Sequence, residues 1–135
     1  MSDLFQINDK DLWSLIHNKH NDKGGVYKII AFQGGQRISI NRFLGTDKDG
    51  ILYIGKATSF IDRVIELKKS IAPDYNGKGH ICGRRYKSNP KIAESFPYEV
   101  LFIELTESNK PEELEKQLLN EYAKIFGEVP PLNAI

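Results

Sequence analysis

Hydrophobic residues in this chain follow two patterns, one typical of strands and one typical of helices. Runs rich in β-branched and aromatic residues predict four strands, at GVYKIIAF (25–32), the alternating RISINRFL (37–44), ILYIG (51–55) and YEVLFIEL (98–105). The QGGQ sequence predicts a turn after the first strand. The GTDKDG sequence, with its Asp-Gly pair, predicts a turn after the second.

Apolar residues three or four positions apart predict helices in four places. These are a helix capped by Asn8 with a stripe of Leu12, Trp13, Leu15 and Ile16, one from Thr58 or Ser59 to about Ile71, a short one from Pro90, and a long one over 108–127. In the long helix, Pro111 suits the first turn and Gly127 the end. Residues 74–89 are expected to form an irregular loop. Hairpins followed by helices predict an α+β fold with a small, mainly antiparallel sheet flanked by helices.

Composition mainly excludes classes of protein. Hydrophobic residues make up 40% and charged residues 27%, as in soluble globular domains, and no apolar run is long enough for a membrane span. The N-terminus lacks the basic start and apolar stretch of a signal peptide, so we expect a cytoplasmic protein. A single cysteine, Cys82, excludes an intramolecular disulfide and a cysteine-based zinc site.

The net charge of +1 does not indicate a nucleic-acid-binding protein, but the distribution of charge is uneven. KGHICGRRYKSNPK, from Lys78 to Lys91, holds five Lys or Arg residues and no acid. Such a segment either attracts phosphate or is a solvated basic loop. The candidate nucleic-acid contacts are Lys78, His80, Arg84, Arg85 and Lys87, with Tyr86 for base stacking and Arg37 and Arg42 as further candidates.

Glu115 breaks the amphipathic pattern of the long helix. At about 100° per residue, it lies in the middle of the apolar arc of Leu118, Leu119, Tyr122 and Phe126. An ionised carboxylate that faces a core is costly unless it is paired or binds a metal. Three interpretations are open: a buried salt bridge, for which Arg63 is a candidate partner, a helix start that projects past the core, and a functional carboxylate.

Arg63, Tyr27 and Tyr53 each have an ordinary and a functional interpretation. Arg63 lies at the margin of the apolar arc of its helix, where arginines often extend to solvent, but a guanidinium there also suits a bidentate phosphate contact. The two tyrosines fit the faces of half-buried strands. Each has a glycine nearby, Gly25 or Gly55, which permits close backbone approach beside the phenol.

Together these residues form a pattern that resembles the GIY-YIG nuclease superfamily. Gly25-Val26-Tyr27 and Tyr53-Ile54-Gly55 are similar to its two tripeptides. In YIGKATSFIDR, the lysine, the alanine and the arginine ten residues after the tyrosine are similar to the endonuclease domain of the bacterial nucleotide excision repair nuclease. EKQLLNEY resembles the helix that carries the family's acid, and PPLN resembles the segment of its closing asparagine. The resemblance spans 24–133, with the five elements in the family's order.

The resemblance implies a GIY-YIG-like fold and a metal-dependent endonuclease that hydrolyses phosphodiester bonds, with DNA favoured over RNA. It implies the following roles: Glu115 holds one Mg²⁺ or Mn²⁺, Arg63 contacts the scissile phosphate, Tyr27 is the general base, Tyr53 positions the water or shares that role, and Asn133 ties the tail to the site. A free phenol has a pKa of about 10, so Arg63, Lys56 and the metal-bound waters are expected to lower it.

The chain departs from the family pattern in several places. Tyr53 follows Tyr27 by 26 positions, which implies an inserted strand and turns at 33–50 within one domain over 1–135, after a helical extension at 1–23. Leu67 stands where some members carry a histidine. His80 is therefore assigned no role by resemblance: it contacts phosphate, holds a loop, or does neither.

Specificity is expected to come from the insert, the basic loop or a protein partner, since no separate DNA-binding domain is evident. The alternatives to an enzyme are a nucleic-acid-binding module or a protein-interaction module that keeps the fold without catalysis.

Overall fold

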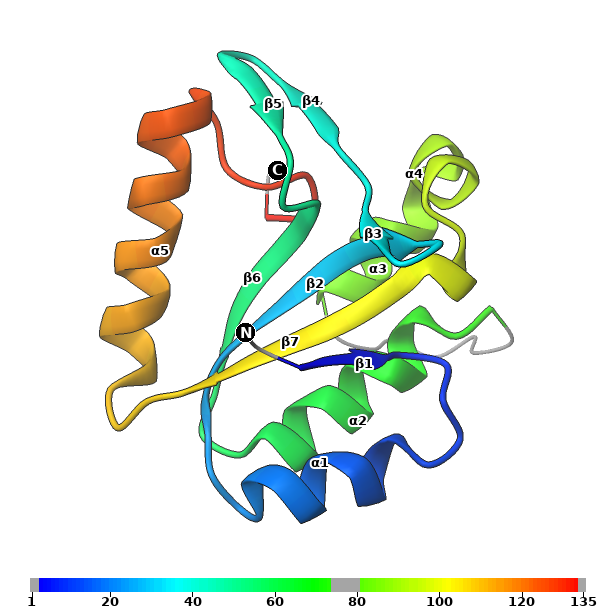
Figure 1. Cartoon of the computed structure of the whole chain (residues 1–135), viewed down its shortest axis with the longest axis vertical. Coiled ribbons are helices and arrows are strands. Elements are labelled where there is room, and N and C mark those ends of the chain that lie inside the picture. Colours follow the sequence, from blue (N-terminus) through cyan, green and yellow to red (C-terminus); the bar gives the residue numbers. More distant parts are fainter. Residues whose placement is uncertain (1–2, 74–80, 134–135) are drawn as a thin grey trace.

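The computed structural model describes residues 3–73 and 81–133, in which one main sheet is covered by helices on both faces (Figure 1). The strands are β1 (Leu4–Gln6), β2 (Gly25–Gln33), β3 (Gln36–Arg37), β4 (Ile40–Arg42), β5 (Gly45–Asp47), β6 (Ile51–Ala57) and β7 (Leu101–Glu107). The helices are α1 (Leu12–His20), α2 (Phe60–Ile71), α3 (Ile81–Ser88), α4 (Pro90–Ser95) and α5 (Pro111–Phe126), with a short 3-10 helix, η1 (Tyr98–Val100), before β7. The predicted α+β class with a small antiparallel sheet is confirmed.

Strand β2 is the centre of the main sheet. It pairs antiparallel with β7 on one side and with β6 on the other, while β1 extends the sheet beyond β7. A turn at Gly34 and Gly35, both with positive φ, folds β3 back onto the end of β2. Strands β4 and β5 form a separate two-stranded hairpin. Strand β6 is therefore an edge strand, with one side open to other contacts.

Alternate residues of β2 contribute to two cores. Tyr27, Ile29 and Ala31 join the core formed with α1, α2 and α3, whereas Val26 and Ile30 pack against α5. Figure 1 shows α5 on one side of the sheet and the other helices on the opposite side. Covering both faces explains why β2 reads as an almost continuous apolar run instead of a simple alternation.

The strands and helices with the strongest local patterns were predicted correctly. Strands β2 and β6 and helices α2, α4 and α5 lie where the sequence places them. Gly127 ends α5 in the left-handed conformation, with φ of 77°. No helix in the described part of the chain is long and apolar enough to cross a membrane.

The prediction for 37–50 is wrong in detail. RISINRFL is divided between β3 and β4, and part of the expected turn is strand β5. The hairpin is bent onto the end of α5, where the Leu44 N–H donates to the Phe126 carbonyl at 2.9 Å and the Phe43 N–H to Glu128 Oε2 at 2.7 Å. These non-local hydrogen bonds compete with a continuous strand.

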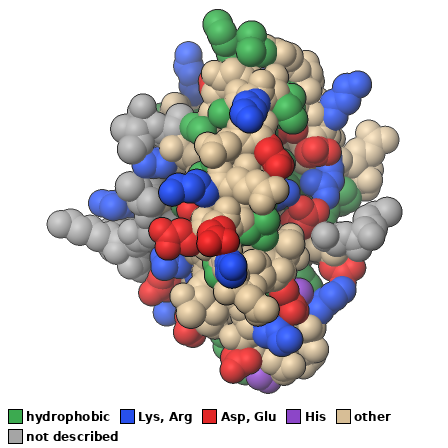
Figure 2. Space-filling model, turned by 90° about the vertical axis from the view of Figure 1, so that its left-hand side faces the viewer, with side chains coloured by type: hydrophobic (Ala, Val, Ile, Leu, Met, Phe, Trp, Pro, Cys, Tyr) green, Lys and Arg blue, Asp and Glu red, His purple; other side chains and the backbone are tan. Residues whose placement is uncertain are grey.

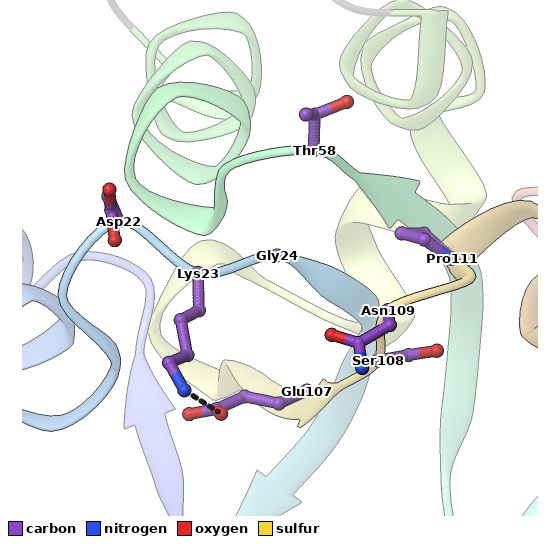
Figure 3. Close-up of a pocket in the computed structure, with 8 residues that line it drawn as sticks. All are labelled: Asp22, Lys23, Gly24, Thr58, Glu107, Ser108, Asn109 and Pro111. Atoms are coloured by element: carbon purple, nitrogen blue, oxygen red, sulfur yellow. Dashed lines mark ion pairs between the residues drawn. The ribbon is translucent and has the colours of Figure 1, made fainter.

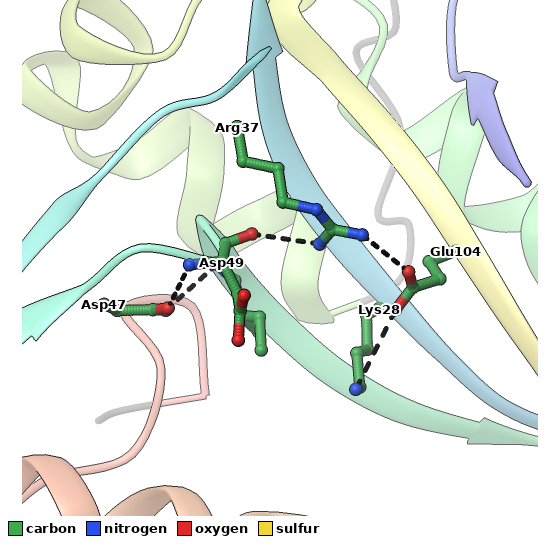
Figure 4. A network of polar contacts seen from close by, with 6 residues as sticks. Lys28, Arg37, Asp47, Asp49 and Glu104 are labelled. Carbon is green, nitrogen blue, oxygen red and sulfur yellow. Dashed lines mark hydrogen bonds and ion pairs between the residues drawn. The ribbon is translucent and has the colours of Figure 1, made fainter. Parts of the chain in front are cut away.

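Asp47 fixes this inserted segment to the rest of the fold (Figure 4). It is buried, and its carboxylate accepts hydrogen bonds from the backbone N–H groups of Asp49, at 2.8 Å, and Ile51, at 3.1 Å. The Tyr122 hydroxyl of α5 donates to the same carboxylate at 2.9 Å. The charge of a buried aspartate is thereby compensated by three donors.

Two further predictions near the ends of the described ranges are wrong. The first helix begins at Leu12, not near Asn8, and Trp13 is half-exposed, because residues 4–6 form β1 and pair with β7. Residues 81–88 form α3 instead of a loop. Lys78 and His80 lie outside the described residues.

Candidate active site

The two predicted catalytic tyrosines lie together on adjacent strands. Tyr27 of β2 is opposite Gly55 of β6, and Tyr53 is two residues before that glycine on the same face. Their ring centroids are 5.8 Å apart, and both rings fold over Gly55. A Cβ at Gly55 would lie 2.5 Å from Tyr27 Cζ and 2.7 Å from Tyr53 Cε2, so only glycine leaves room for both phenols.

Burial dominates the electrostatics of this pair. It raises the pKa of Tyr27, strongly, and that of Tyr53, while the Arg63 charge opposes the shift at Tyr27. The hydrogen bond between the two hydroxyls raises the pKa of Tyr27 and lowers that of Tyr53, the signs expected when Tyr27 donates to Tyr53. Arg63 lowers the pKa of Tyr27, as predicted, but the loss of hydration outweighs it, so the pKa of this phenol lies above its usual value.

Arg63 lies in the first turns of α2, directly after β6. Its side chain is 42% exposed and forms a loose ion pair with Glu66, with Nη1 and Oε2 3.9 Å apart. The guanidinium charge lowers the pKa of Tyr27. Arg63 also borders a hollow of about 240 Å³, whose other lining residues are Thr58, Ser59, Asp62 and Glu66. Arg63 therefore faces both the tyrosine pair and solvent.

Glu115 reaches the same region from α5, around the edge strand. Its carboxylate accepts a hydrogen bond from the Lys56 backbone N–H, and its negative charge raises the pKa of Tyr53. Burial raises the pKa of Glu115, while the Lys56 charge opposes this shift and the Glu112 charge reinforces it. The cation beside Glu115 is thus Lys56, and Arg63 pairs with Glu66 instead.

Lys56 does not occupy the position expected for activating the phenols. Alternation along β6 turns it to the α5 side, away from Tyr53, and its ammonium lies 3.8 Å from Glu112. The charge of Lys56 acts on Glu115, whose pKa it lowers. The predicted role for Lys56 is corrected accordingly.

Asn133 ties the tail to β6. Its side-chain oxygen accepts from the Ile54 N–H, and its amide nitrogen donates to the Ile54 carbonyl, both at 2.9 Å. The neighbouring Leu132 N–H donates to the Leu52 carbonyl at 2.8 Å. These contacts provide the tether that the sequence predicted and partly cover the edge of the sheet.

Helix α3 also borders the site, which the sequence did not indicate. Cys82 is buried, and burial raises the pKa of its thiol. The nearby sulfur raises the pKa of both phenols. The charge of Arg85, one turn later, lowers the pKa of Tyr53, and its guanidinium donates a hydrogen bond to the Leu132 carbonyl at 2.8 Å. The signal that could have located α3 is the helical spacing of Cys82 and Tyr86, both of which are buried.

The other residues of the predicted basic loop differ in exposure. Arg84 is exposed and Lys87 is half-buried. Tyr86 is 5% exposed and its hydroxyl donates to the Phe96 carbonyl at 2.7 Å. The prediction that Tyr86 stacks on bases is therefore wrong, because its ring is part of the core.

The arginines of the inserted segment have intramolecular partners, and Figure 4 shows those of Arg37. Arg37 donates to Glu104 at 2.7 Å and to the Asp49 carbonyl at 3.1 Å. Arg42 donates to the Val129 carbonyl at 2.6 Å and pairs with Glu128 at 3.2 Å. These contacts hold the insert in place and leave a role in substrate binding without support.

A second hollow adjoins the Arg63 hollow at Thr58, which lines both (Figure 3). Its volume is about 350 Å³, and it lies where β2 begins and β6 and β7 end, lined by Asp22, Lys23, Gly24, Thr58, Glu107, Ser108, Asn109 and Pro111. Lys23 and Glu107 form an ion pair across it at 3.8 Å. The adjoining hollows give a polar surface around Thr58 that includes Arg63.

The α5 side of the molecule shows acidic and basic side chains interspersed (Figure 2). Such a surface lacks the continuous positive field that attracts a phosphate backbone. A polyanionic ligand would therefore find no continuous cationic surface on this side of the molecule.

The donors available for a metal are few. No group of three or more His, Cys, Asp or Glu side chains comes together among the described residues. Glu115 offers a half-buried carboxylate beside Glu112. One carboxylate fits a Mg²⁺ ion that keeps several waters and takes its other ligands from a substrate phosphate, and it does not fit a preformed protein cage.

No protein-family model, curated protein or solved structure matches this chain. What the site does must therefore be inferred from its own residues and geometry.

Proposed function

We propose that this chain is a metal-dependent endonuclease of the GIY-YIG type that hydrolyses phosphodiester bonds, with DNA as the favoured substrate. One observation carries the proposal: Tyr27 and Tyr53 lie together over Gly55, with the Arg63 charge lowering the pKa of Tyr27 and the Glu115 charge raising that of Tyr53, so that groups from four separate elements meet at the pair. Phosphodiester hydrolysis needs an oriented water, a cation for the phosphate and a site for a metal ion. These four side chains can supply all three.

Arg63 binds the scissile phosphate in this proposal. Its guanidinium is partly exposed, only loosely paired, and close enough to affect Tyr27. A planar guanidinium can donate two parallel hydrogen bonds to a phosphate and stabilise the charge that develops there. Glu66 is displaced from its 3.9 Å contact when the phosphate binds.

The two tyrosines act as one unit. The signs of the two pKa shifts assign Tyr27 as the donor in this proposal. The Tyr53 oxygen, which is nearer to solvent and whose pKa Glu115 affects, then orients the attacking water. Transfer of the water's proton to a phenol requires the phenolate, whose formation becomes easier when cationic charge is added beside the pair. This arrangement shifts the direct role from Tyr27 towards Tyr53.

Glu115 holds the divalent ion, Mg²⁺ or Mn²⁺, with the Lys56 N–H fixing its carboxylate. When bound there, the ion neutralises phosphate charge and makes a coordinated water more acidic. The raised pKa of Glu115 means that this carboxylate is insufficiently solvated in the free protein, a condition that a cation relieves.

A nucleic-acid-binding module without catalysis is the second candidate. The observation in its favour is the burial of Tyr27, which is 1% exposed and whose pKa is raised. A phenol in that state is a poor base at neutral pH. Such a module would bind DNA and leave it intact.

Nicking of supercoiled plasmid in Mg²⁺ or Mn²⁺, against EDTA, separates the two candidates. Glu115→Gln and Tyr53→Phe are expected to lose about 10²-fold or more of the rate. Glu121→Gln, on the same helix, and Tyr122→Phe, a buried tyrosine on the other side of the sheet, are the matched controls and should nick as the wild type does. Nicking that survives both site substitutions would refute the proposal, and a panel of duplex, single-stranded, branched and RNA substrates would define specificity.

A further inference from the structure

The tail holds Tyr53 from both sides along β6. Leu132 is hydrogen-bonded to Leu52, and Asn133 is hydrogen-bonded twice to Ile54, so the two backbone positions that flank Tyr53 are both fixed. Leu132 is fully buried. The tail therefore forms a rigid wall beside the tyrosine pair.

Arg85 is attached to this wall. Its Nη1 donates to the Leu132 carbonyl at 2.8 Å, and its charge acts on Tyr53. A guanidinium has five N–H donors in a planar fork, and one hydrogen bond leaves most of them for another acceptor. The bond to Leu132 fixes the direction in which that fork points.

The guanidinium of Arg85 forms no ion pair with a carboxylate of the described residues. Arg37, Arg42 and Arg63 each form an ion pair with a glutamate, whereas the described contact of Arg85 is with a neutral carbonyl. A half-buried cation without an anionic partner is costly, and a bound anion offsets that cost. The place beside Tyr53 is where a substrate phosphate would come if the proposed function holds.

We propose that Arg85 is a second phosphate-binding guanidinium of this site, held in place by the Leu132 carbonyl. It contacts a DNA phosphate on the Tyr53 side of the tyrosine pair, and Arg63 contacts the phosphate on the Tyr27 side. Two guanidinium groups, one acting on each tyrosine, fix the path of one strand across the pair. The proposal rests on the proposed function for its ligand, but it concerns binding and not hydrolysis.

The salt dependence of DNA affinity tests this inference without any cleavage. Affinity for a labelled duplex is measured in EDTA over a range of KCl concentrations, because each phosphate contact contributes about 0.9 to the slope of log K against log salt. Arg85→Gln is expected to reduce the slope by about 0.9, and Arg85→Lys to keep it. Lys10→Gln removes an exposed lysine in the turn before α1 and should leave the slope unchanged.

Asn133→Ala separates phosphate binding from a purely structural role. It removes both bonds to Ile54 and loosens the end of the tail, but it keeps the guanidinium, its bond to the Leu132 carbonyl and the Leu132–Leu52 bond that positions that carbonyl, so the wild-type slope is expected. An unchanged slope in Arg85→Gln, or an equal loss of slope in Asn133→Ala, would overturn the proposal. Binding without nicking by the wild type would instead refute the hydrolase and leave Arg85 as a phosphate ligand.

A second measurement needs no variant. In the wild type, modification of arginines by phenylglyoxal is followed by mass spectrometry with and without DNA. Arg85 should be protected by DNA, whereas Arg37, bound to Glu104, should react equally in both conditions. Equal modification of Arg85 with and without DNA would contradict the inference even if Arg85→Gln fails to fold.

Discussion

Gly55→Ala is the substitution that tests the geometry of the site most directly. The new Cβ would lie 2.5 Å from Tyr27 Cζ, 2.6 Å from the Tyr27 hydroxyl and 2.7 Å from Tyr53 Cε2. Carbon atoms pack at about 3.5 Å or more, so the rings must move by about 1 Å. Strand β2 is hydrogen-bonded on both sides, so the side chains move more easily than the backbone.

The expected magnitude has two parts. Inserting a methyl group into a close-packed core costs about 1–3 kcal/mol in the free energy of unfolding. A displacement of about 1 Å in a positioned catalytic group reduces the rate by about 10²-fold. We therefore expect Gly55→Ala to remain folded, to unfold at lower urea concentration, and to nick plasmid about 10²-fold more slowly under the proposed function.

Urea unfolding followed by circular dichroism measures the first part, and plasmid nicking with saturating metal measures the second. Gly34→Ala is the matched control: its φ of 63° strains an alanine, but nothing lies within 4 Å of the new Cβ. It should lose about 1 kcal/mol of stability and no activity. If Gly55→Ala keeps wild-type stability, the two phenols do not lie over Gly55. If it loses stability but not activity, the phenols are not part of the chemistry.

Three further substitutions test other parts of the structure. Burial raises the folded-state pKa of Glu115, so ionisation of this carboxyl opposes folding above that pKa. Glu115→Gln should therefore keep or raise the melting temperature at pH 7 while nicking is lost. A clear fall in melting temperature would contradict this. The hydrogen bond from His20 holds the pKa of Glu107 below its usual range, so its contribution to stability is present above about pH 4.3 and is lost as pH falls through the lower, folded-state pKa. Glu107→Gln should therefore lower the melting temperature at pH 7 but not at pH 3, and a pH-independent difference would argue against the pair. Asp47→Ala leaves two backbone N–H groups and the Tyr122 hydroxyl without their acceptor and should cost about 2–4 kcal/mol in urea unfolding, whereas a loss below about 1 kcal/mol would mean that water replaces the carboxylate.

Local pattern was sufficient for the elements with a long or strongly signalled repeat. Strands β2 and β6 have β-branched and aromatic runs next to glycines, and α5 has a proline in its first turn and a glycine after its last. These signals act through backbone geometry within a few residues, so they are legible without knowledge of the fold. Strand β1 and helix α3 were missed because a three-residue strand and an eight-residue polar helix are stabilised by their partners, β7 and α2.

The identities of the candidate site residues were also legible in the sequence. Strand alternation placed Tyr27 and Tyr53 on definite faces, and helical geometry identified Glu115 as a carboxylate directed towards apolar neighbours. The structure brings these residues together and adds a reason for Gly55, which lies under both rings. Sequence spacing alone could not show that contact, because it depends on the register in which β2 and β6 pair, which places Tyr27 opposite Gly55.

The electrostatics of the site were decided by the tertiary structure alone. The sequence predicted that cations would lower the pKa of the phenols, but burial by α2 and α3 raises it, and Lys56 acts on Glu115 from the other face of β6. Arg85 reaches Tyr53 only because α3 and the tail pack side by side. Periodicity is a property of neighbouring residues in the chain and can be read from it. Hydration and charge proximity depend on which distant segments pack together, and only the folded chain determines them.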